Sequence, residues 1–520
     1  MDSERLRRFL AAASQFRLGR LVTEQPHPLT ADLSRLAVED PAQALRLLHR
    51  VDREALATLQ RAVAGIEQLA AAIAETLGSG RDVHLCGCGA TGRLALACET
   101  IWRHEHAGTP LENRVHSFMA GGDVALIRSI EGFEDHPEFG SRQLAESGFA
   151  DGDLLVACTE GGETPFVIGA TLAAADTSSN SPWFLYCNPD DVLCEVADRS
   201  RLVIEDARVR KLNLSCGPMA VSGSTRMQAS TVLMAAAGMA LLYGAGEIRR
   251  RLDELIDWYE RADVSFLAPF VVRESAAYAG HYLLYETVPR LAITVLTDTT
   301  ERSPTFSMVP FENDADKAAP WSLCHLYVPA AADSREAWER MLMRPPRTLE
   351  WSETGPMTSS GRLYGFDFSA RLARRRGGTR HRRFTIGYDG AALNFALDGP
   401  AHRLELHGLP FLSAHLVLKM LLNMQSTLVM GRLGRYDGNI MTWVRPANNK
   451  LVDRAIRYAD AILKRRGVTA GYGELARCCF ELMETAPQDQ SLVGEMVNRI
   501  LCTGNDQGSG NSLSSSSTRK

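Results

Sequence analysis

A glycine-rich loop follows the first strand-like run of the sequence and could bind an anion. Residues 83–86 lead directly into Gly87-Cys88-Gly89-Ala90-Thr91-Gly92-Arg93 and then into a helix-like segment, which formally fits the G-x-G-x-x-G pattern. Small residues at the start of a helix expose backbone N–H groups to the phosphate of a nucleotide or of a sugar. A dinucleotide site also needs an acidic residue at the end of the second strand, about 20 residues on. Here that strand-like run ends in Ala120-Gly121-Gly122-Asp123, farther along the chain, so a dinucleotide site is disfavoured but stays open.

Two further polar loops could present donors to the same ligand. Residues 158–165 read Cys-Thr-Glu-Gly-Gly-Glu-Thr-Pro, and the proline suits the first turn of a following helix. Residues 222–227 read Ser-Gly-Ser-Thr-Arg-Met and precede a long apolar segment. One such loop alone would be an ordinary helix cap, but three together predict a site for a phosphorylated ligand. The predicted ligand-binding residues of the three loops are Gly89, Ala90, Thr91, Gly92, Thr159, Gly161, Gly162, Thr164, Ser224 and Thr225.

These motifs, in this order, resemble the N-acetylmuramic acid 6-phosphate etherases and the related glucokinase regulatory proteins. The resemblance rests on residues 87–93, 120–123, 131–135 (Glu-Gly-Phe-Glu-Asp), 187–189 (Cys-Asn-Pro) and 222–227. Residues 23–24 and 450–483 also resemble that family's N-terminal segment and helical tail, so the likeness covers most of the chain apart from its Ser-rich end. The resemblance implies two tandem sugar isomerase (SIS) domains, fused as in the regulatory proteins, which share one ligand site.

The resemblance also implies where the catalytic carboxylates lie. The etherases carry a glutamate in an Asp-x-x-Glu-x-Pro-Pro-Thr-aromatic motif soon after the first glycine loop. Residues 94–103 of this chain lack that motif, and Glu99 is out of register. Residues 298–306, Asp-Thr-Thr-Glu-Arg-Ser-Pro-Thr-Phe, resemble it well and belong to the second domain. We therefore expect that this carboxylate, Glu301, has moved from the first domain to the second.

Two other residues complete the implied site. Glu134, within residues 131–135, is the second catalytic carboxylate. The family places a lysine after the Ser-Arg-Met turn, where this chain has Gln228, but the apolar helix of the second domain retains Lys419, which an anionic ligand could pair. Without the resemblance, Glu134 would be part of a solvated acidic turn, and Glu301 would form a surface ion pair with Arg302. The second domain has no matching glycine-rich loop, so we expect one site per chain.

For an etherase, the resemblance implies elimination of a lactyl ether from an amino-sugar 6-phosphate. Opening the sugar exposes an aldehyde that acidifies the neighbouring C–H bond; one carboxylate removes that proton, another acid protonates the departing oxygen, and water then adds to the alkene. Glu134 and Glu301 are expected to do this, either one being the base. No metal or organic cofactor is needed, which agrees with a sequence that has no His/Cys cluster at zinc spacing.

Two other functions stay open at this stage. A non-catalytic sensor of fructose phosphates that regulates a sugar kinase would keep comparable glutamates, and the tandem architecture favours it. The short, Ser-rich end after Met483 argues against it, because a segment that contacts a kinase is only partly represented. A sugar-phosphate isomerase would follow from the domain type alone, and no residue singles out an isomerase base.

The predicted first domain, residues 56–263, must hold these loops in an α/β fold. Apolar residues recur at three-and-four spacing over 56–77 and predict a helix, and helices are also predicted over 225–243 and 247–263. The strand-like runs between them are 83–86, 115–119, 154–158, 183–187 and 202–204. This alternation predicts a parallel sheet with crossover helices, whose ligand lies at the carboxyl ends of the strands.

A second α/β domain is predicted over residues 264–448, so the predicted fold is two tandem SIS-type domains with parallel sheets flanked by helices. Its predicted strands are 291–296, 324–328, 384–388 and 404–407. The basic run 371–383 lacks interleaved aromatics and is interpreted as a solvated loop, not a nucleic-acid patch. We expect helical segments over 1–55 and 449–503, and an unfolded tail over 504–520 because it is rich in Ser and Gly.

Composition excludes several classes of partner. The formal net charge is -5 from 57 basic and 62 acidic residues, so no global field favours nucleic acid or an anionic membrane. Eleven scattered cysteines without C-x-x-C pairs indicate reduced thiols and a cytoplasmic location. No run approaches the roughly 18 apolar residues of a membrane span, and the N-terminus does not resemble a signal peptide. We expect a small-molecule sugar phosphate as the ligand and leave the oligomeric state open.

Overall fold

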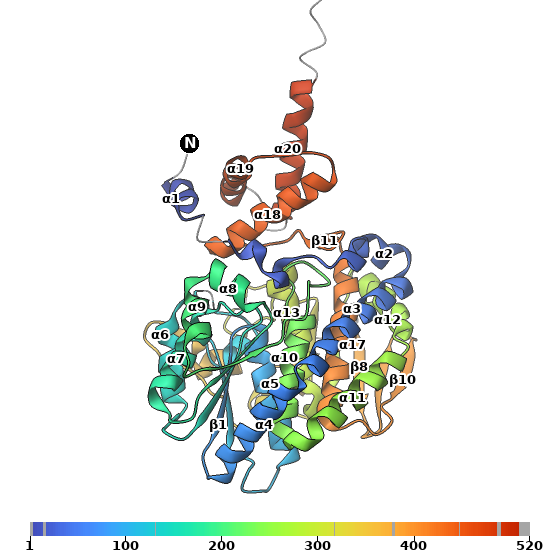
Figure 1. The fold of residues 1–520 in the computed structure, drawn as a ribbon. Coiled ribbons are helices and arrows are strands. Elements are labelled where there is room, and N and C mark those ends of the chain that lie inside the picture. The colour runs from blue at the N-terminus through green and yellow to red at the C-terminus, as the bar shows by residue number, and fades with distance from the viewer. Residues whose placement is uncertain are drawn as a thin grey trace, which may run out of the picture.

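Two sheets, one from each half of the chain, form the body of the protein, and long helices fill the space between them (Figure 1). A computed structural model describes residues 4–13, 17–130, 132–316, 318–376, 380–446, 448–485 and 490–508. The helices between the sheets are α5 (Ala90–Glu105), α10 (Gln228–Leu242), α13 (Pro289–Phe306) and α17 (Phe411–Arg432). They contact one another across the middle of the molecule, and this position buries α10 and α17 almost completely.

The first sheet is parallel throughout, as its sequence predicts. Its strands are β1 (Val83–Gly87), β2 (Val115–Met119), β3 (Leu154–Cys158), β4 (Trp183–Tyr186) and β5 (Arg210–Asn213), in the order β2-β1-β3-β4-β5. Every residue of β1 and β3 is buried, because helices cover both faces of a parallel sheet. The other helices of this half are α2 (Leu33–Glu39), α3 (Pro41–Arg61), α4 (Val63–Gly78), α6 (Pro137–Glu146), α7 (Pro165–Thr177), α8 (Asp190–Val196), α9 (Asp198–Glu205) and α11 (Ala245–Arg261).

The strand predicted at 202–204 is wrong, and those residues belong to α9. Val203 is fully buried whereas Leu202 is 65% exposed, so this apolar run has the one-sided burial of a helix and not of a central strand. The last strand of the sheet is β5, a few residues farther on, where Leu212 is buried between polar neighbours. The single helix predicted over 56–77 is divided between α3 and α4 by Ala62.

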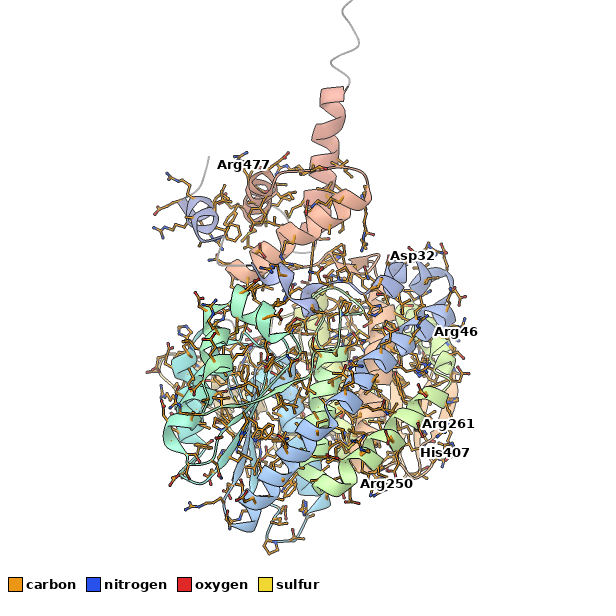
Figure 2. All side chains as sticks on the ribbon, in the orientation of Figure 1. Asp32, Arg46, Arg250, Arg261, His407 and Arg477 are labelled. Atoms are coloured by element: carbon orange, nitrogen blue, oxygen red, sulfur yellow. The ribbon has the colours of Figure 1, made fainter. Side chains whose placement is uncertain are left out.

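The outer helices are amphipathic and cover the core with one face each. On α11, Ile248 and Leu252 are buried against α3 and α4. The charged side chains of Arg250 and Arg261 lie on its outer face, as does Arg46 on α3 (Figure 2). This distribution is the one expected for helices at the surface of an α/β domain.

The second sheet is mixed, which corrects the parallel sheet predicted there. Its strands are β6 (Tyr282–Thr287), β7 (Cys324–Tyr327), β8 (His381–Tyr388), β9 (Ala392–Leu397) and β10 (Ala401–Glu405), in the order β10-β9-β8-β6-β7. β6 pairs with β7 and β8 in parallel, but β9 is antiparallel to both β8 and β10. Tight turns at Gly390 and Gly399, both with positive φ, join these three strands as hairpins. The other helices of this half are α12 (Ala268–Ala277), α14 (Ser334–Leu342), α15 (Ser360–Tyr364) and α16 (Ala370–Arg376).

Two further predictions for the second half are wrong. Residues 291–296, predicted as a strand, lie in α13, which Pro289 begins and whose apolar residues are buried on every side because the helix lies between the two sheets. The basic run 371–383, predicted as a solvated loop, contributes to α16 and β8. Arg376 is buried there and pairs with Glu312, with Nη2 of the arginine 2.6 Å from Oε2 of the glutamate.

The C-terminal helices lie together at one end of the molecule (Figure 1). After the short strands β11 (Tyr436–Asp437) and β12 (Ile440–Met441), the chain forms α18 (Asn449–Arg465), α19 (Tyr472–Thr485) and α20 (Leu492–Gly508), and α1 (Glu4–Ala12) contacts α19. The first residues of the tail predicted to be unfolded, 504–508, belong to α20, and residues 509–520 lie outside the described residues. In the described part of the chain, no helix is long and apolar enough to cross a membrane.

A buried ion cluster joins the two halves beside β2. Glu99 on α5 is 1% exposed and contacts Arg344 and Arg347 of the second half at 3.0 and 2.9 Å. Arg344 also contacts Asp123 at 2.6 Å. Although burial alone would raise it, these arginines lower the pKa of Glu99 to about 2. Glu99, which does not align with the catalytic motif of the etherases, therefore holds the two halves together.

Replacing Glu99 with Gln should lower the free energy of unfolding by ~3 kcal/mol at pH 7, because the buried Arg344 and the partly buried Arg347 both lose the charge of this carboxylate. The lowered pKa means that the stabilisation is present above the ordinary pKa of 4.5 and is lost as the pH falls toward about 2. The difference between Glu99→Gln and the wild type should therefore shrink on acidification. Urea unfolding at several pH values measures it, with Glu105→Gln at the exposed end of the same helix as the control. Equal stability of both variants would contradict the assignment.

Candidate functional site

A cavity of about 470 Å³ lies at the carboxyl ends of β1, β2 and β3, between the first sheet and the C-terminal end of α13. The N-terminal segment (Thr23 and Glu24) and the segment from Met441 to Arg454 line its other sides. Segments from both ends and from both halves of the chain therefore meet around one space. The predicted site residues that line it are Gly89, Ala90, Glu134, Gly161, Thr164, Ser224, Thr225 and Glu301. Glu131, the first residue of the 131–135 motif, lies outside the described residues.

The other predicted binding residues, Thr91, Gly92, Thr159, Gly162 and Lys419, lie behind this lining. The Thr91 hydroxyl accepts from the Cys88 N–H and donates to the Cys88 carbonyl, both at 2.9 Å, so it closes the glycine loop on itself. Thr159 lies 3.1 Å from the Thr164 hydroxyl and accepts from the Gly162 N–H at 3.3 Å. These threonines shape the loops whose neighbours face the cavity.

The N-termini of three helices lie at or near the cavity lining. α5 begins at Ala90 and α7 at Pro165, and neither has a side-chain cap, so no hydroxyl or carboxylate competes for their first N–H groups. The turn at 222–227 precedes α10 in the same wall. Gly223 makes that turn possible: its φ is +68°, and a Cβ there would lie 2.2 Å from the Tyr458 hydroxyl. The partial positive charge of helix N-termini favours a phosphate at this wall.

Glu301 is 3% exposed and faces the cavity from α13. Its neighbour Arg302 does not pair with it but with Asp298 and Glu274, at 2.9 and 2.6 Å, so a surface ion pair is excluded. Glu301 forms an ion pair with Arg226, whose Nη1 lies 3.9 Å from Oε2. Within the described residues this Oε2 is buried without a hydrogen-bond partner. Burial raises the pKa of Glu301, and the nearby positive charges only partly oppose it.

Lys419 is buried between α17 and the start of α10. Its Nζ donates to the Arg226 carbonyl at 2.7 Å, to the Thr231 hydroxyl at 2.8 Å and to Asn423 Oδ1 at 3.0 Å. Burial lowers its pKa to about 8. The ammonium group therefore supports the turn that carries Ser224 from behind, and direct contact with a ligand stays a prediction.

Glu134 lies opposite the second domain, in the turn Phe133–Asp135. It is half-buried, and Oε2 lies 3.9 Å from the Cys88 sulfur. The same wall holds an ion pair that the sequence pattern did not predict: Lys450 Nζ lies 2.5 Å from Glu163 Oε1, and Arg199 contacts the other carboxylate oxygen. Although burial alone would raise it, these two cations lower the pKa of Glu163 to about 2.

Known proteins resemble this chain mainly through its first half. Residues 66–175 match the family described as the glucokinase regulatory protein N-terminal SIS domain. These residues therefore resemble a SIS domain. The N-acetylmuramic acid 6-phosphate etherase of Rhodopirellula baltica is 35% identical over 219 residues, which are 41% of this chain and 65% of that protein. That of Burkholderia lata is 32% identical over 218 residues, 41% of this chain and 64% of that protein. The expected resemblance is confirmed, and the matched part spans slightly less than two thirds of these relatives.

A putative phosphosugar isomerase from Silicibacter pomeroyi, a solved structure, aligns with 75% of this chain and 98% of its own at 14% identity and a TM-score of 0.41. Tagatose-6-phosphate ketose/aldose isomerase from Escherichia coli aligns with 74% of this chain and 92% of its own, at 12% identity and a TM-score of 0.39.

Several lining residues of the SIS domain's cavity were missed from the sequence. Glu160 and Glu163 lie inside the loop 158–165. The prediction for this loop rested on its small residues and did not include its two carboxylates. The sequence did contain a signal for these two residues, because acidic side chains are unexpected in a loop that is predicted to bind an anion. Lys450 and Arg454 come from α18, far along the chain, and only the fold places them here. Arg454 Nη2 lies 2.5 Å from Oε1 of Glu24, so this helix is tied to the N-terminal segment.

Ser224→Ala should weaken anion binding without weakening the fold. Among the described residues, the Ser224 hydroxyl is buried with no hydrogen-bond partner, and it lines the cavity. Its removal breaks no contact within the protein but deprives a phosphate of about 1 kcal/mol of hydrogen bonding, or roughly fivefold in affinity. Calorimetry with inorganic phosphate and with glucose 6-phosphate, together with the melting temperature, measures both effects.

The matched control is Ser222→Ala two residues earlier. The Ser222 hydroxyl donates to the Glu24 carbonyl at 2.7 Å, so this change should lower the melting temperature. If Ser224→Ala lost stability and bound phosphate normally, its hydroxyl would have a structural role instead.

Proposed function

We propose that the chain binds a phosphorylated amino sugar in this cavity and cleaves its lactyl ether, as the name N-acetylmuramic acid 6-phosphate etherase describes for its relatives. One observation carries the proposal: Glu134 of the first domain and Glu301 of the second line one cavity together with the phosphate-type loops of the SIS domain. Two carboxyl groups and an anion site are the groups that elimination from a sugar phosphate requires.

The phosphate binds at the N-termini of α5 and α7, where uncapped N–H groups and the Ser224 hydroxyl point to it. This placement fixes the far end of the substrate and leaves the sugar ring toward Glu301 and Glu134. Because the phosphate and the sugar ring are held in one site, the reacting groups are already positioned beside the two glutamates, and this positioning raises the rate.

The two glutamates have different environments, which separates their roles. Glu301 is buried, its pKa is raised, and it therefore suits the acid that protonates the departing lactate oxygen. Glu134 is less buried and suits the base that removes the acidified C–H proton. Water then adds to the alkene, and Glu134 returns its proton in that step.

A second function has its own support. The family matched by residues 66–175 is named for a regulatory protein, and the chain has two α/β units in tandem. A sensor would bind a fructose phosphate in the same cavity and alter the affinity for a sugar kinase without turnover. An isomerase has no such specific observation in its favour.

Incubation of the protein with N-acetylmuramic acid 6-phosphate should release lactate, detected with a coupled dehydrogenase. A preparation that binds fructose 6-phosphate tightly but releases no lactate would instead support the sensor. The experiment separates the two functions because only the first breaks a carbon–oxygen bond.

Glu301→Gln should lower kcat by ~10²–10⁴-fold, because the amide cannot donate a proton to the leaving oxygen. Binding of glucose 6-phosphate should remain within about tenfold of the wild type, since the anion contacts come from the other domain. Glu105→Gln, whose exposed carboxylate does not line the cavity, is the control. Unchanged turnover in Glu301→Gln would refute its role as the acid.

A further inference from the structure

Glu160 also lines the cavity that contains Glu134 and Glu301. It follows β3 directly, in the loop that leads to α7. Its backbone carbonyl accepts from the Cys187 N–H at 3.1 Å, which fixes the loop to the end of β4. Neither the motif pattern nor the elimination described above gives this residue a task.

The Glu160 side chain is fixed as firmly as its backbone. The Ser230 hydroxyl, from the first turn of α10, donates to Oε1 at 2.6 Å. Ser230 is itself 1% exposed, so this contact is enclosed by protein. Glu160 itself is half-buried and lines the cavity. A carboxyl group that is held by a short hydrogen bond from an enclosed hydroxyl has a defined position toward a ligand in that cavity.

The charges around Glu160 oppose its ionisation. Burial raises its pKa to about 7; the Ser230 hydrogen bond and Lys419 oppose the rise, and Glu301 adds to it. Two carboxyl groups in one desolvated cavity cannot both carry charge without a large electrostatic penalty, so ionisation of one disfavours that of the other. The charged and titratable groups that face it from the surrounding elements are Glu301 on α13, Lys419 on α17, Arg93 on α5, and the thiols Cys88, Cys158 and Cys187.

We propose that Glu160 is the uncharged carboxyl group of the site and donates a hydrogen bond to the sugar oxygen that gains negative charge during the reaction. This inference rests on the proposed etherase function. A neutral acid in a low-dielectric site is a strong donor to a developing oxyanion and, unlike a carboxylate, does not repel a bound phosphate.

In this mechanism Glu134, Glu160 and Glu301 each act in one step of the elimination. The carboxylate of Glu134 takes the proton from the carbon beside the aldehyde, and the C–H electron pair forms a C=C bond while the carbonyl pair moves onto oxygen. Glu160 donates its hydrogen bond to that oxygen and keeps its proton. The oxygen's pair then re-forms the carbonyl, and the C=C pair moves to the next C–C bond, where it forms the alkene. The bond to the lactyl oxygen breaks with its pair on that oxygen, which receives the proton of Glu301. Atoms and charges balance without a further reactant.

The test compares Glu160→Gln with Glu160→Ala. The glutamine amide remains neutral and can donate an N–H to the oxyanion, whereas alanine leaves no donor. We expect kcat to fall by ~10²–10³-fold in Glu160→Ala and by no more than about tenfold in Glu160→Gln. Above pH 7 the wild type should lose activity as Glu160 ionises, and Glu160→Gln should lose less, because its neutral group does not titrate.

Infrared spectroscopy gives a readout without substrate. The C=O band of a protonated carboxyl group should be present in the wild type at pH 6, decline through about pH 7, and be weaker in Glu160→Gln. Glu75→Gln, on the exposed face of α4, is the control and should keep the band.

Equal loss of kcat in the Gln and Ala variants, or an unchanged infrared band in Glu160→Gln, would overturn the role of Glu160 while leaving the etherase function intact. A wild type that releases no lactate would overturn both proposals, so the two failures are distinguishable.

Discussion

The Arg226 guanidinium group joins the two halves of the protein at the point where the site is built. Its Nη1 contacts Asp298 at 3.0 Å, and its Nη2 donates to Ser426 and Thr427 at 3.0 and 3.1 Å. All of these side chains are buried, so the contacts form in a low-dielectric region, where breaking a charge pair costs about 3–5 kcal/mol. Arg226 belongs to the turn that carries Ser224, and Asp298 lies one helical turn before Glu301. This single interaction therefore sets the distance between the anion-binding turn and the carboxyl group of the other domain.

The two halves contribute different parts to the proposed site. In the second half, Val288 and Pro289 connect β6 to α13 with no glycine-rich loop, so this connection lacks the backbone N–H groups that residues 87–93 could offer to an anion in the first half. In the first half, Glu99 of α5 is engaged by Arg344 and Arg347 of the second half in the ion cluster beside β2, and it does not line the cavity. The first half thus supplies the glycine-containing loops, and the second half supplies Glu301, to one cavity.

The sequence could predict the parts of the site that depend on local geometry. Parallel strands end at one edge of a sheet, so residues 87–93 and 158–165 had to lie close together, and the motif at 298–306 identified Glu301. Burial in the middle of the molecule could not be predicted. Because α13 is enclosed on all sides, residues 291–296 lack helical periodicity and resemble a strand. Lys419 was expected at the ligand, but how α17 crosses α10 decides that its ammonium group meets the carbonyls of Arg226 and Met227. The hairpins of the second sheet had a visible signal in the Asp-Gly turns at 389–390 and 398–399.

An anion site lined by acidic residues poses an electrostatic problem, and the structure handles each carboxyl group differently. Glu24 and Glu163 are held by Arg454 and Lys450, so their charges are neutralised before a ligand arrives. Burial raises the pKa of Glu301 and of Glu160 and favours the uncharged acid in each. Glu134 also lines the cavity and lies near the ammonium group of Lys450. The burial that weakens the repulsion of a phosphate also leaves Glu301 and Glu160 with protons to share, so in the proposed function anion binding and acid catalysis depend on one physical cause.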